Sequence, residues 1–431
     1  MNRPNIIFYF SDQQRADTAG CYGQRLPVTP CLDAVAREGT VFENAFSCQP
    51  VCGPMRACLQ SGVYATQTGC YRNDIALPTD CETVAKCLSR AGYDTAYIGK
   101  WHLASDKEHN LKTKATPRER RGGYDYWRAS DVLEFTSHGY NGYVFDENEN
   151  RLDFTGYRAD AINDYALEYI EKKKHDKPFF MFISQLEPHH QNDRLRFEAP
   201  RGAKKAFKNY DVPGDLAGTL GDWRVQMPSY LACCNRVDMN FGKLIKSLKD
   251  NGLYDNTVII YTSDHGCHFR TRNAEYKRSC HEASIKVPLV ITGGAFTGGG
   301  RISELVSLID LPATVLDIAG ADIPSHFVGK SLTDLKGHDS VFMQISESQT
   351  GRAVRTDRWK YSVAAKNRDA AFAESYTEDF LYDLEKDPFE KNNLICNPDY
   401  AQVRSQMREL LISYMKKADE PYTNIIEKSQ K

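Results

Sequence analysis

The segment Asn5-Ile6-Ile7-Phe8-Tyr9-Phe10 is a short, largely apolar run that Ser11-Asp12-Gln13 ends abruptly. A run of this length, bounded by polar residues, is typical of a strand buried on both faces of a parallel sheet. Helical patterns separate it from similar runs further along the chain. Alternating strands and helices predict an α/β fold with a large, mainly parallel sheet sandwiched by helices. The other strand-like runs are Thr95–Ile98, Phe179–Leu186, Thr257–Thr262 and Val287–Thr292.

The pattern changes after about Ala321, where helix and strand signals stop alternating. Several short strand-like segments with hairpin spacing then predict a smaller antiparallel sheet. Apolar positions at helical spacing over Tyr400–Ala418 predict a closing helix. We therefore expect an N-terminal catalytic α/β domain over residues 1–335 and a C-terminal α+β subdomain over 336–431. The strand-like segments are Val341–Ile345, Ala353–Thr356, Lys360–Val363 and Phe380–Tyr382.

The composition is that of an ordinary globular enzyme. Lys and Arg number 55 against 57 Asp and Glu, so no overall positive field exists to gather nucleic acid or an anionic membrane. No stretch approaches the ~20 apolar residues of a membrane span, and the Met1-Asn2-Arg3-Pro4 start does not resemble a signal peptide. We expect a cytoplasmic protein, although a removed leader would leave the same sequence. Thirteen scattered cysteines favour reduced thiols over a disulfide framework.

Polar residues follow the ends of several predicted strands. Asp12-Gln13 follows the first strand, and Asp264-His265 follows Thr257–Thr262. In an open α/β sheet, ligands bind at the carboxyl edge of the strands, so these residues are expected to converge. Each pair alone is common in turns. Together they offer two carboxylates, an amide oxygen and an imidazole, which is enough for one divalent cation.

A basic set lies at the same predicted edge. Lys100 stands between Gly99 and Trp101 at the end of an apolar strand, where a solvated lysine is not expected. Cations beside a metal suit a substrate that carries a tetrahedral oxyanion, whose oxygens they neutralise. The set comprises Arg56, Lys100, His102, His189 and Lys277.

The segment from Cys52-Gly53-Pro54-Met55-Arg56 to Gly62 resembles the formylglycine signature of type I sulfatases, which belong to the alkaline-phosphatase-like superfamily. Further blocks occur in the order familiar from that family. The departures are Met55, Gln13 and His265, where the family often has Ser, Asp and Asn. Calcium is the usual ion of the family, but an imidazole is an unusual calcium ligand, so magnesium and manganese remain open. The other blocks are Asp12-Gln13, Gly99-Lys100-Trp101-His102, Pro188-His189, Ser263-Asp264-His265-Gly266, Lys277 and Leu381–Pro388.

The resemblance implies a mechanism and a partner. A separate maturation enzyme would convert Cys52 to formylglycine, whose hydrate sits on the metal with Asp12, Gln13, Asp264 and His265. One hydroxyl would attack sulfur while the alcohol leaves, which gives a sulfated intermediate. The second hydroxyl would then lose its proton, the carbon–oxygen bond to sulfate would break, and the aldehyde would be restored.

The resemblance also assigns roles to the basic residues. Arg56 would hold the residue-52 diol, and Lys100 and Lys277 would bind sulfate oxygens. His102 would assist the collapse of the sulfated intermediate. His189 would protonate the leaving alcohol, because imidazole titrates near neutral pH, with His190 as a rival.

The substrate class follows from two polar segments beside catalytic positions. His190, Asn192 and Arg272 offer hydrogen-bonding groups there, and we expect them to contact a sugar. This favours a sulfated saccharide, derived from a glycosaminoglycan or another glycan, over a small aryl sulfate.

Three other functions remain open. A phosphonate monoester or phosphodiester hydrolase of the same superfamily can share this signature. A non-catalytic relative that binds sulfated glycans would keep the fold, although it would be expected to lose Cys52, a carboxylate or the lysines. Cys52 could also act as a thiol nucleophile paired with His102 or His189, but that role explains neither the metal set nor the lysines.

Overall fold

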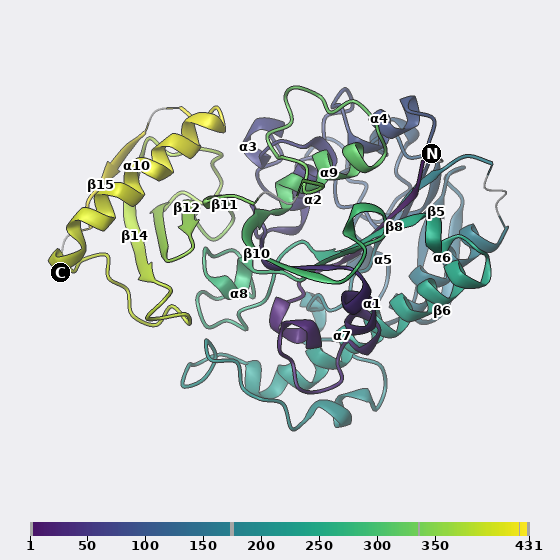
Figure 1. Cartoon of the computed structure of the whole chain (residues 1–431), viewed down its shortest axis with the longest axis horizontal. Coiled ribbons are helices and arrows are strands. Elements are labelled where there is room, and N and C mark those ends of the chain that lie inside the picture. The colour runs from purple at the N-terminus through teal and green to yellow at the C-terminus, as the bar shows by residue number, and fades with distance from the viewer. Residues whose placement is uncertain (1–2, 173–175, 335–336, 422, 429–431) are drawn as a thin grey trace.

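The computed structural model describes residues 3–172, 176–334, 337–421 and 423–428, and these residues form a large and a small sheet (Figure 1). The large sheet has ten strands in the order β10-β2-β9-β8-β1-β7-β3-β4-β5-β6. Its strands are β1 (Asn5–Ser11), β2 (Thr40–Phe46), β3 (Asp94–Lys100), β4 (Tyr126–Ser130), β5 (Tyr140–Asp146), β6 (Arg151–Tyr157), β7 (Phe179–Ser184), β8 (Thr257–Ser263), β9 (Leu289–Thr292) and β10 (Gly300–Ser307).

Helices cover both faces of the large sheet, as the sequence predicts. Successive residues of β1 alternate between two hydrophobic cores, with Ile6 and Phe8 in one and Ile7 and Tyr9 in the other. The first core contains residues of α2, α4 and α9, and the second contains residues of α1, α6 and α7. The helices of this region are α1 (Pro30–Glu38), α2 (Cys52–Ser61), α3 (Ala65–Thr68), α4 (Val84–Arg90), α5 (Leu133–Thr136), α6 (Arg158–Lys172), α7 (Trp223–Asp250), α8 (Glu282–Ile285) and α9 (Leu311–Ile318).

The centre of the large sheet is parallel. β1 pairs in parallel with β7 and β8, and β3 pairs in parallel with β7 and β4. The predicted parallel direction of the Val287–Thr292 segment is wrong, because β9 runs antiparallel to both β8 and β2. A parallel strand requires a crossover that returns the chain to the opposite edge. The segment between β8 and β9 instead stays at the carboxyl edge of β8, so β9 must run back.

The predicted small sheet and closing helix are confirmed. Strands β11 to β14 form an antiparallel meander, and β15 adds in parallel to β14. Helix α10 (Ala401–Lys417) packs against β12 and β13, at the yellow end of the chain in Figure 1. The predicted domain boundary at 335/336 lies outside the described residues. The strands are β11 (Ser340–Ile345), β12 (Thr350–Thr356), β13 (Trp359–Ala365), β14 (Ser375–Asp383) and β15 (Asn424–Ile426).

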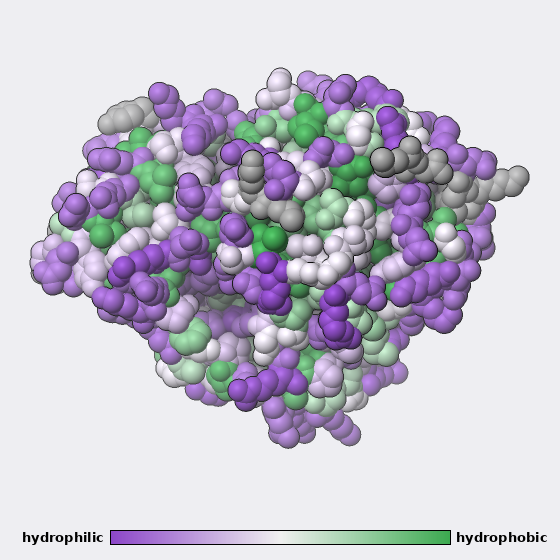
Figure 2. Space-filling view, viewed as in Figure 1, coloured by the Kyte–Doolittle hydropathy of each residue, from purple (hydrophilic) through white to green (hydrophobic). Residues whose placement is uncertain are grey.

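The surface carries mixed polar groups, and Figure 2 shows apolar residues scattered over a mainly hydrophilic face. Within the described ranges, no helix combines the length and apolar character needed to cross a membrane. The thirteen cysteines all lie within the described residues, and none of them forms a disulfide.

Candidate active site

The predicted residues meet at the carboxyl edge of the central parallel strands. Asp12 follows β1, Lys100 ends β3, His189 lies in the loop after β7 and Asp264 follows β8. Because β8, β1, β7 and β3 are parallel neighbours, their ends bring these side chains together.

Helix α2 delivers Cys52 to this edge from outside the sheet. Cys52 is the first residue of the helix, every residue of α2 is buried, and the thiol-bearing residue is only 2% exposed. Its Sγ lies 2.7 Å from Lys277 Nζ, 3.4 Å from Asp12 Oδ1 and 3.4 Å from His265 Nε2. Burial, followed by the Asp12 charge, raises the pKa of Cys52 to about 12. The thiol is therefore protonated at neutral pH, which argues against a conventional thiolate nucleophile.

Four buried residues could hold a cation. Ligand atoms of Asp12, Cys52, Asp264 and His265 all lie within 4.8 Å of one another. Asp264 Oδ1 accepts hydrogen bonds from the backbone of Gln13 and His265, whereas Oδ2 has no hydrogen-bond partner in the described structure. His265 Nδ1 lies 3.0 Å from the Gly266 carbonyl and must donate to it, so Nε2 presents its lone pair to the group.

The charges of this group fit a divalent cation. Burial and the nearby Asp12 raise the pKa of Asp264 to about 7. Burial acts in the same direction on Asp12, but Lys100, His189, Lys277 and Arg56 outweigh it and hold the pKa of Asp12 well below its usual range. Two buried carboxylates and a neutral imidazole therefore share one small volume, an arrangement that a cation would stabilise.

Gln13 lies beside the group, but its side chain makes other contacts. Its Oε1 accepts a hydrogen bond from the backbone of His190 at 3.3 Å, and its Nε2 donates to Cys267 Sγ. The backbone N–H of Gln13 instead orients Asp264. The role of its amide as a metal ligand remains a prediction.

Three buried cations surround the carboxylates. Arg56 donates to Asp12 Oδ2 at 3.1 Å, to Ser184 Oγ and to the Lys100 carbonyl, so it ties α2 to β7 and β3. Lys100 Nζ lies 2.9 Å from Asp12 Oδ2. Lys277 Nζ lies between Cys52 and His189. Arg56 thus positions the Asp12 carboxylate, and Lys277 lies beside residue 52.

Both predicted catalytic histidines are neutral in this structure. Burial, followed by Lys277, lowers the pKa of His189 well below its usual value, and burial followed by Lys100 does the same for His102. His189 Nε2 lies 3.1 Å from Lys277 Nζ and accepts its hydrogen bond, which places the imidazole proton on Nδ1. His102 is half-buried and adopts a left-handed backbone with φ of 60°.

Of the three predicted sugar contacts, His190 and Asn192 lie together, and Arg272 makes other contacts. His190 is buried and stacks on Tyr276 with ring centroids 4.2 Å apart. Asn192 is exposed and contacts His190 Nδ1 at 3.1 Å. The Arg272 guanidinium donates to the carbonyls of Phe389 and Glu390 at 2.8 Å each, and its role as a sugar contact remains a prediction.

The structure adds residues that sequence reasoning missed. Glu134 of α5 accepts a hydrogen bond from Lys100 Nζ at 3.0 Å. Asn73 Oδ1 accepts from the Gly53 N–H, next to Cys52, and the backbone and side-chain amides of Asn73 donate to Glu347. Glu347 also pairs with Arg278 and lies between β11 and β12, so the small sheet contributes to the site. None of these positions follows a recognisable strand or belongs to a motif.

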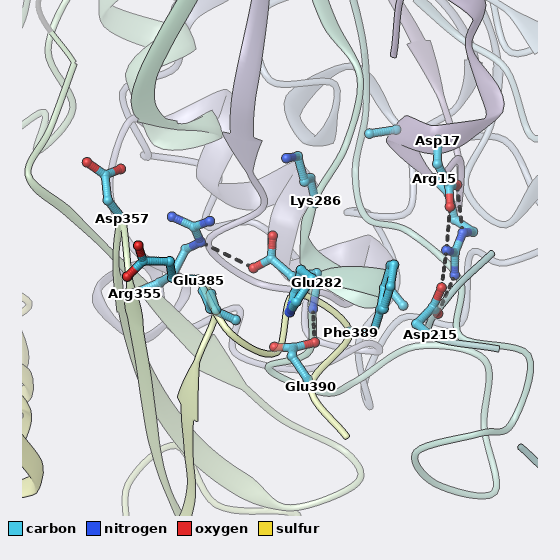
Figure 3. A pocket seen from close by; sticks show the side chains of 14 residues that line it. Arg15, Asp17, Asp215, Glu282, Lys286, Arg355, Asp357, Glu385, Phe389 and Glu390 are labelled. Carbon is cyan, nitrogen blue, oxygen red and sulfur yellow. Dashed lines mark hydrogen bonds and ion pairs between the residues drawn. The ribbon is translucent and has the colours of Figure 1, made fainter. Parts of the chain in front are cut away.

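A cavity of about 420 Å³ opens elsewhere, between the two sheets (Figure 3). Arg15, paired with Asp17 and Asp215, lines one side, and Glu282, paired with Arg355, lines the other. None of the predicted catalytic or metal residues lines this cavity. Its charged groups join the two parts of the molecule.

Two family models match the chain. The model described as "Sulfatase" matches residues 4–321, and the model "N-sulphoglucosamine sulphohydrolase, C-terminal" matches residues 274–417.

Proteins of known name or structure resemble the chain over nearly its whole length. The uncharacterized sulfatase YidJ of Escherichia coli K12 is 30% identical over an alignment of 458 residues, covering 98% of this chain and 89% of YidJ. The N-acetylglucosamine-6-O-sulfatase of Bacteroides thetaiotaomicron is 26% identical and covers 95% of this chain and 86% of its own length. The solved structure of BT4656 in complex with its substrate D-glucosamine-2-N,6-O-disulfate is 25% identical, with a TM-score of 0.78 over 97% of this chain and 98% of that one.

Proposed function

The chain belongs to the sulfatase family of sulfuric ester hydrolases, and from that membership we propose that it removes sulfate from a sulfated saccharide. The proposal includes a formylglycine formed from Cys52 by a separate maturation enzyme and one divalent cation, with calcium the first candidate. The observation that carries it is the setting of Cys52, whose Sγ lies beside Asp12, His265 and Lys277.

The donor set fits the cation. Asp12, Asp264 and His265 would hold it, and residue 52 would complete the group. A cation bound there would lower the pKa of a residue-52 hydroxyl and neutralise charge on the sulfate. The hydrated formylglycine would supply one hydroxyl as the nucleophile toward sulfur and a second to expel sulfate.

Side chains around residue 52 would bind the sulfate and transfer the protons. Lys277 Nζ, 2.7 Å from Cys52 Sγ, would bind a sulfate oxygen as it reaches residue 52, and Lys100 would bind another. Arg56 would hold Asp12 in place through its 3.1 Å hydrogen bond. A sulfate between the lysines offsets the positive charge that lowers the pKa of His189. His189 could then carry the proton that the leaving alcohol needs, while His102 would assist release of sulfate.

The saccharide specificity is supported by the named relatives. One is an N-acetylglucosamine-6-O-sulfatase, and the structure of BT4656 contains a sulfated glucosamine.

The test is a screen of defined sulfated saccharides with protein co-expressed with a maturation enzyme. We expect intact mass to show replacement of the Cys52 CH₂SH by an aldehyde, and saccharides to be desulfated faster than nitrophenyl sulfate. Cys52→Ala is the control and should be inactive. Faster hydrolysis of the aryl sulfate would refute the saccharide specificity. A matched aryl phosphodiester hydrolysed faster than either would favour the phosphodiesterase alternative.

A further inference from the structure

The short helix α5 presents two side chains at the edge of the site. Leu133 and Thr136 are buried and anchor the turn in the protein. Gln191 Nε2 donates to the Glu134 carbonyl at 3.0 Å, which fixes the turn against the loop that carries His189 and His190. Glu134 and Phe135, between the two anchors, are more exposed. The turn therefore holds both residues firmly: the Phe135 ring faces solvent, whereas Glu134 Oε2 is buried beside Lys100 without a hydrogen-bond partner among the described residues.

Glu134 places a carboxylate where the substrate is an anion. Its Oε1 accepts from Lys100 Nζ, whereas its Oε2 has no hydrogen-bond partner among the described residues. The side chain is 11% exposed. Burial alone would raise its pKa, but Lys100 and His189 lower the pKa to about 2, so the group is ionised at neutral pH.

Sulfate binding does not explain why the Glu134 carboxylate lies beside Lys100. Lys100 already has Asp12 as an ionic partner at 2.9 Å, so a second carboxylate is not needed to stabilise its charge. A negative group beside Lys100 also repels a sulfate oxygen that approaches the same ammonium. The unpartnered Oε2 of Glu134 is left as an acceptor for a donor group outside the described structure, because an ionised carboxylate can only accept hydrogen bonds.

Phe135 adds an apolar surface next to Glu134. It is 60% exposed, and its ring centroid lies 5.8 Å from Lys112 Nζ. Lys112 pairs with Asp74, which adjoins the Asn73 that contacts Gly53. These contacts link Phe135, through Lys112 and Asp74, to the segment that contacts Gly53 beside Cys52. A solvent-facing aromatic ring there can pack against the apolar face of a sugar.

We propose that Glu134 and Phe135 form the sugar-recognition element of this enzyme. Glu134 accepts a hydrogen bond from a donor group, a hydroxyl or an ammonium, on the carbon that flanks the sulfate ester, and Phe135 packs on the sugar ring. The proposal rests on the proposed function and deepens it. It implies that substrates with a free donor beside the ester are preferred, and that a second sulfate at that carbon is rejected.

The central experiment compares Glu134→Gln with wild type on two substrates. We expect kcat/KM for the best saccharide sulfate to fall at least tenfold, because a charged acceptor becomes a neutral one. The KM for nitrophenyl sulfate, which has no donor, should fall, and inorganic sulfate should inhibit more strongly, because a repulsive charge is lost. Glu171→Gln, at the exposed end of α6, is the matched control and should leave the kcat/KM and KM for both substrates unchanged.

Opposite responses of the two substrates separate recognition from a purely structural role. An equal loss of kcat/KM on both substrates would show that Glu134 only positions Lys100. No change in kcat/KM on either substrate would show that Glu134 has no role in catalysis or recognition. Both results overturn the proposal.

Phe135→Ala should raise the saccharide KM severalfold more than Phe135→Leu does. Matched saccharides with a hydroxyl, an amine or a second sulfate on the flanking carbon test the donor, and a preference for the second sulfate also overturns it.

Binding measurements keep this proposal separate from the proposed function. Calorimetry with Cys52→Ala and with Cys52→Ala/Glu134→Gln needs no turnover. The Glu134 substitution should weaken binding of the saccharide and strengthen binding of inorganic sulfate. If matured wild type hydrolyses no saccharide sulfate, the proposed function fails, and this binding comparison still decides the role of Glu134.

Discussion

The centre of the site and its rim are built differently. The centre consists of Asp12, Cys52, Arg56 and Asp264, which are almost fully buried on the ends of parallel strands and the first turn of α2. The rim consists of half-buried or exposed side chains such as Asn73, Glu134 and Glu347, which come from loops, a four-residue helix and the small sheet. Buried strand ends fix the geometry that sulfate-ester hydrolysis needs, and the loops are free to vary with the rest of the substrate.

The largest effect is expected at the centre, at Cys52 itself. Cys52→Ala should lower turnover by about 10⁴-fold or more, since the nucleophile cannot form. The folded structure should survive, because an alanine fits the space of the buried thiol. The check is turnover of matured protein together with thermal unfolding. Substantial activity in a well-folded variant would remove residue 52 from the mechanism.

The next effect concerns the cation. Asp264→Asn should abolish the rise in melting temperature that calcium, magnesium or manganese gives wild type, and should lower activity by about 10²-fold or more. Thermal shift with each ion, after chelator treatment, measures this directly. A full metal-induced shift in the variant would place the ion elsewhere.

The metal-free protein should also depend on pH. The pKa of Asp264 rises on folding from about 3.8 to about 7, so the folded state binds more protons than the unfolded state between these values. This carboxyl therefore makes the chelated protein less stable as pH rises from about 4 to about 7, and a bound cation should reverse the trend. Melting temperatures across this range, with Asp264→Asn as the control that lacks the trend, test the sign.

A moderate effect is expected where the rim touches the centre. Glu347→Ala removes the acceptor for Asn73 and the partner of Arg278, and should lower kcat/KM by about tenfold. Glu347→Gln retains one acceptor oxygen, so its kcat/KM should fall less than that of Glu347→Ala. A loss of thermal stability without any change in kcat/KM would show that Glu347 only joins the two parts of the molecule.

The smallest effect is expected at Arg272. Arg272→Ala leaves the carbonyls of Phe389 and Glu390 without their donor and should destabilise the protein by about 1–3 kcal/mol. Denaturant unfolding measures this cost. Weaker saccharide binding at unchanged stability would instead support the sugar contact predicted from the sequence.

The accuracy of the sequence prediction follows the same division. Strands β1, β3, β7 and β8 each contain an apolar run and end in polar residues. Their positions, and the convergence of Asp12, Lys100 and Asp264, were therefore predictable. The antiparallel direction of β9 was not, because an apolar run does not reveal which way the connecting loop returns. The hydrogen bonds of Arg272 to the Phe389 and Glu390 carbonyls were not predictable either, because a polar loop residue gives no sign of a backbone partner more than a hundred residues away.

The sequence by itself determined the α/β fold, the Cys52 signature and the residue types of the chemical centre. These features depend on local apolar patterns and on strand ends that a parallel sheet must bring to one edge. Only the tertiary structure decided that Glu134 shares Lys100 with Asp12 and that Glu347 of the small sheet reaches Asn73. Such contacts join segments without periodicity, and their geometry depends on how separate loops pack rather than on any pattern within them.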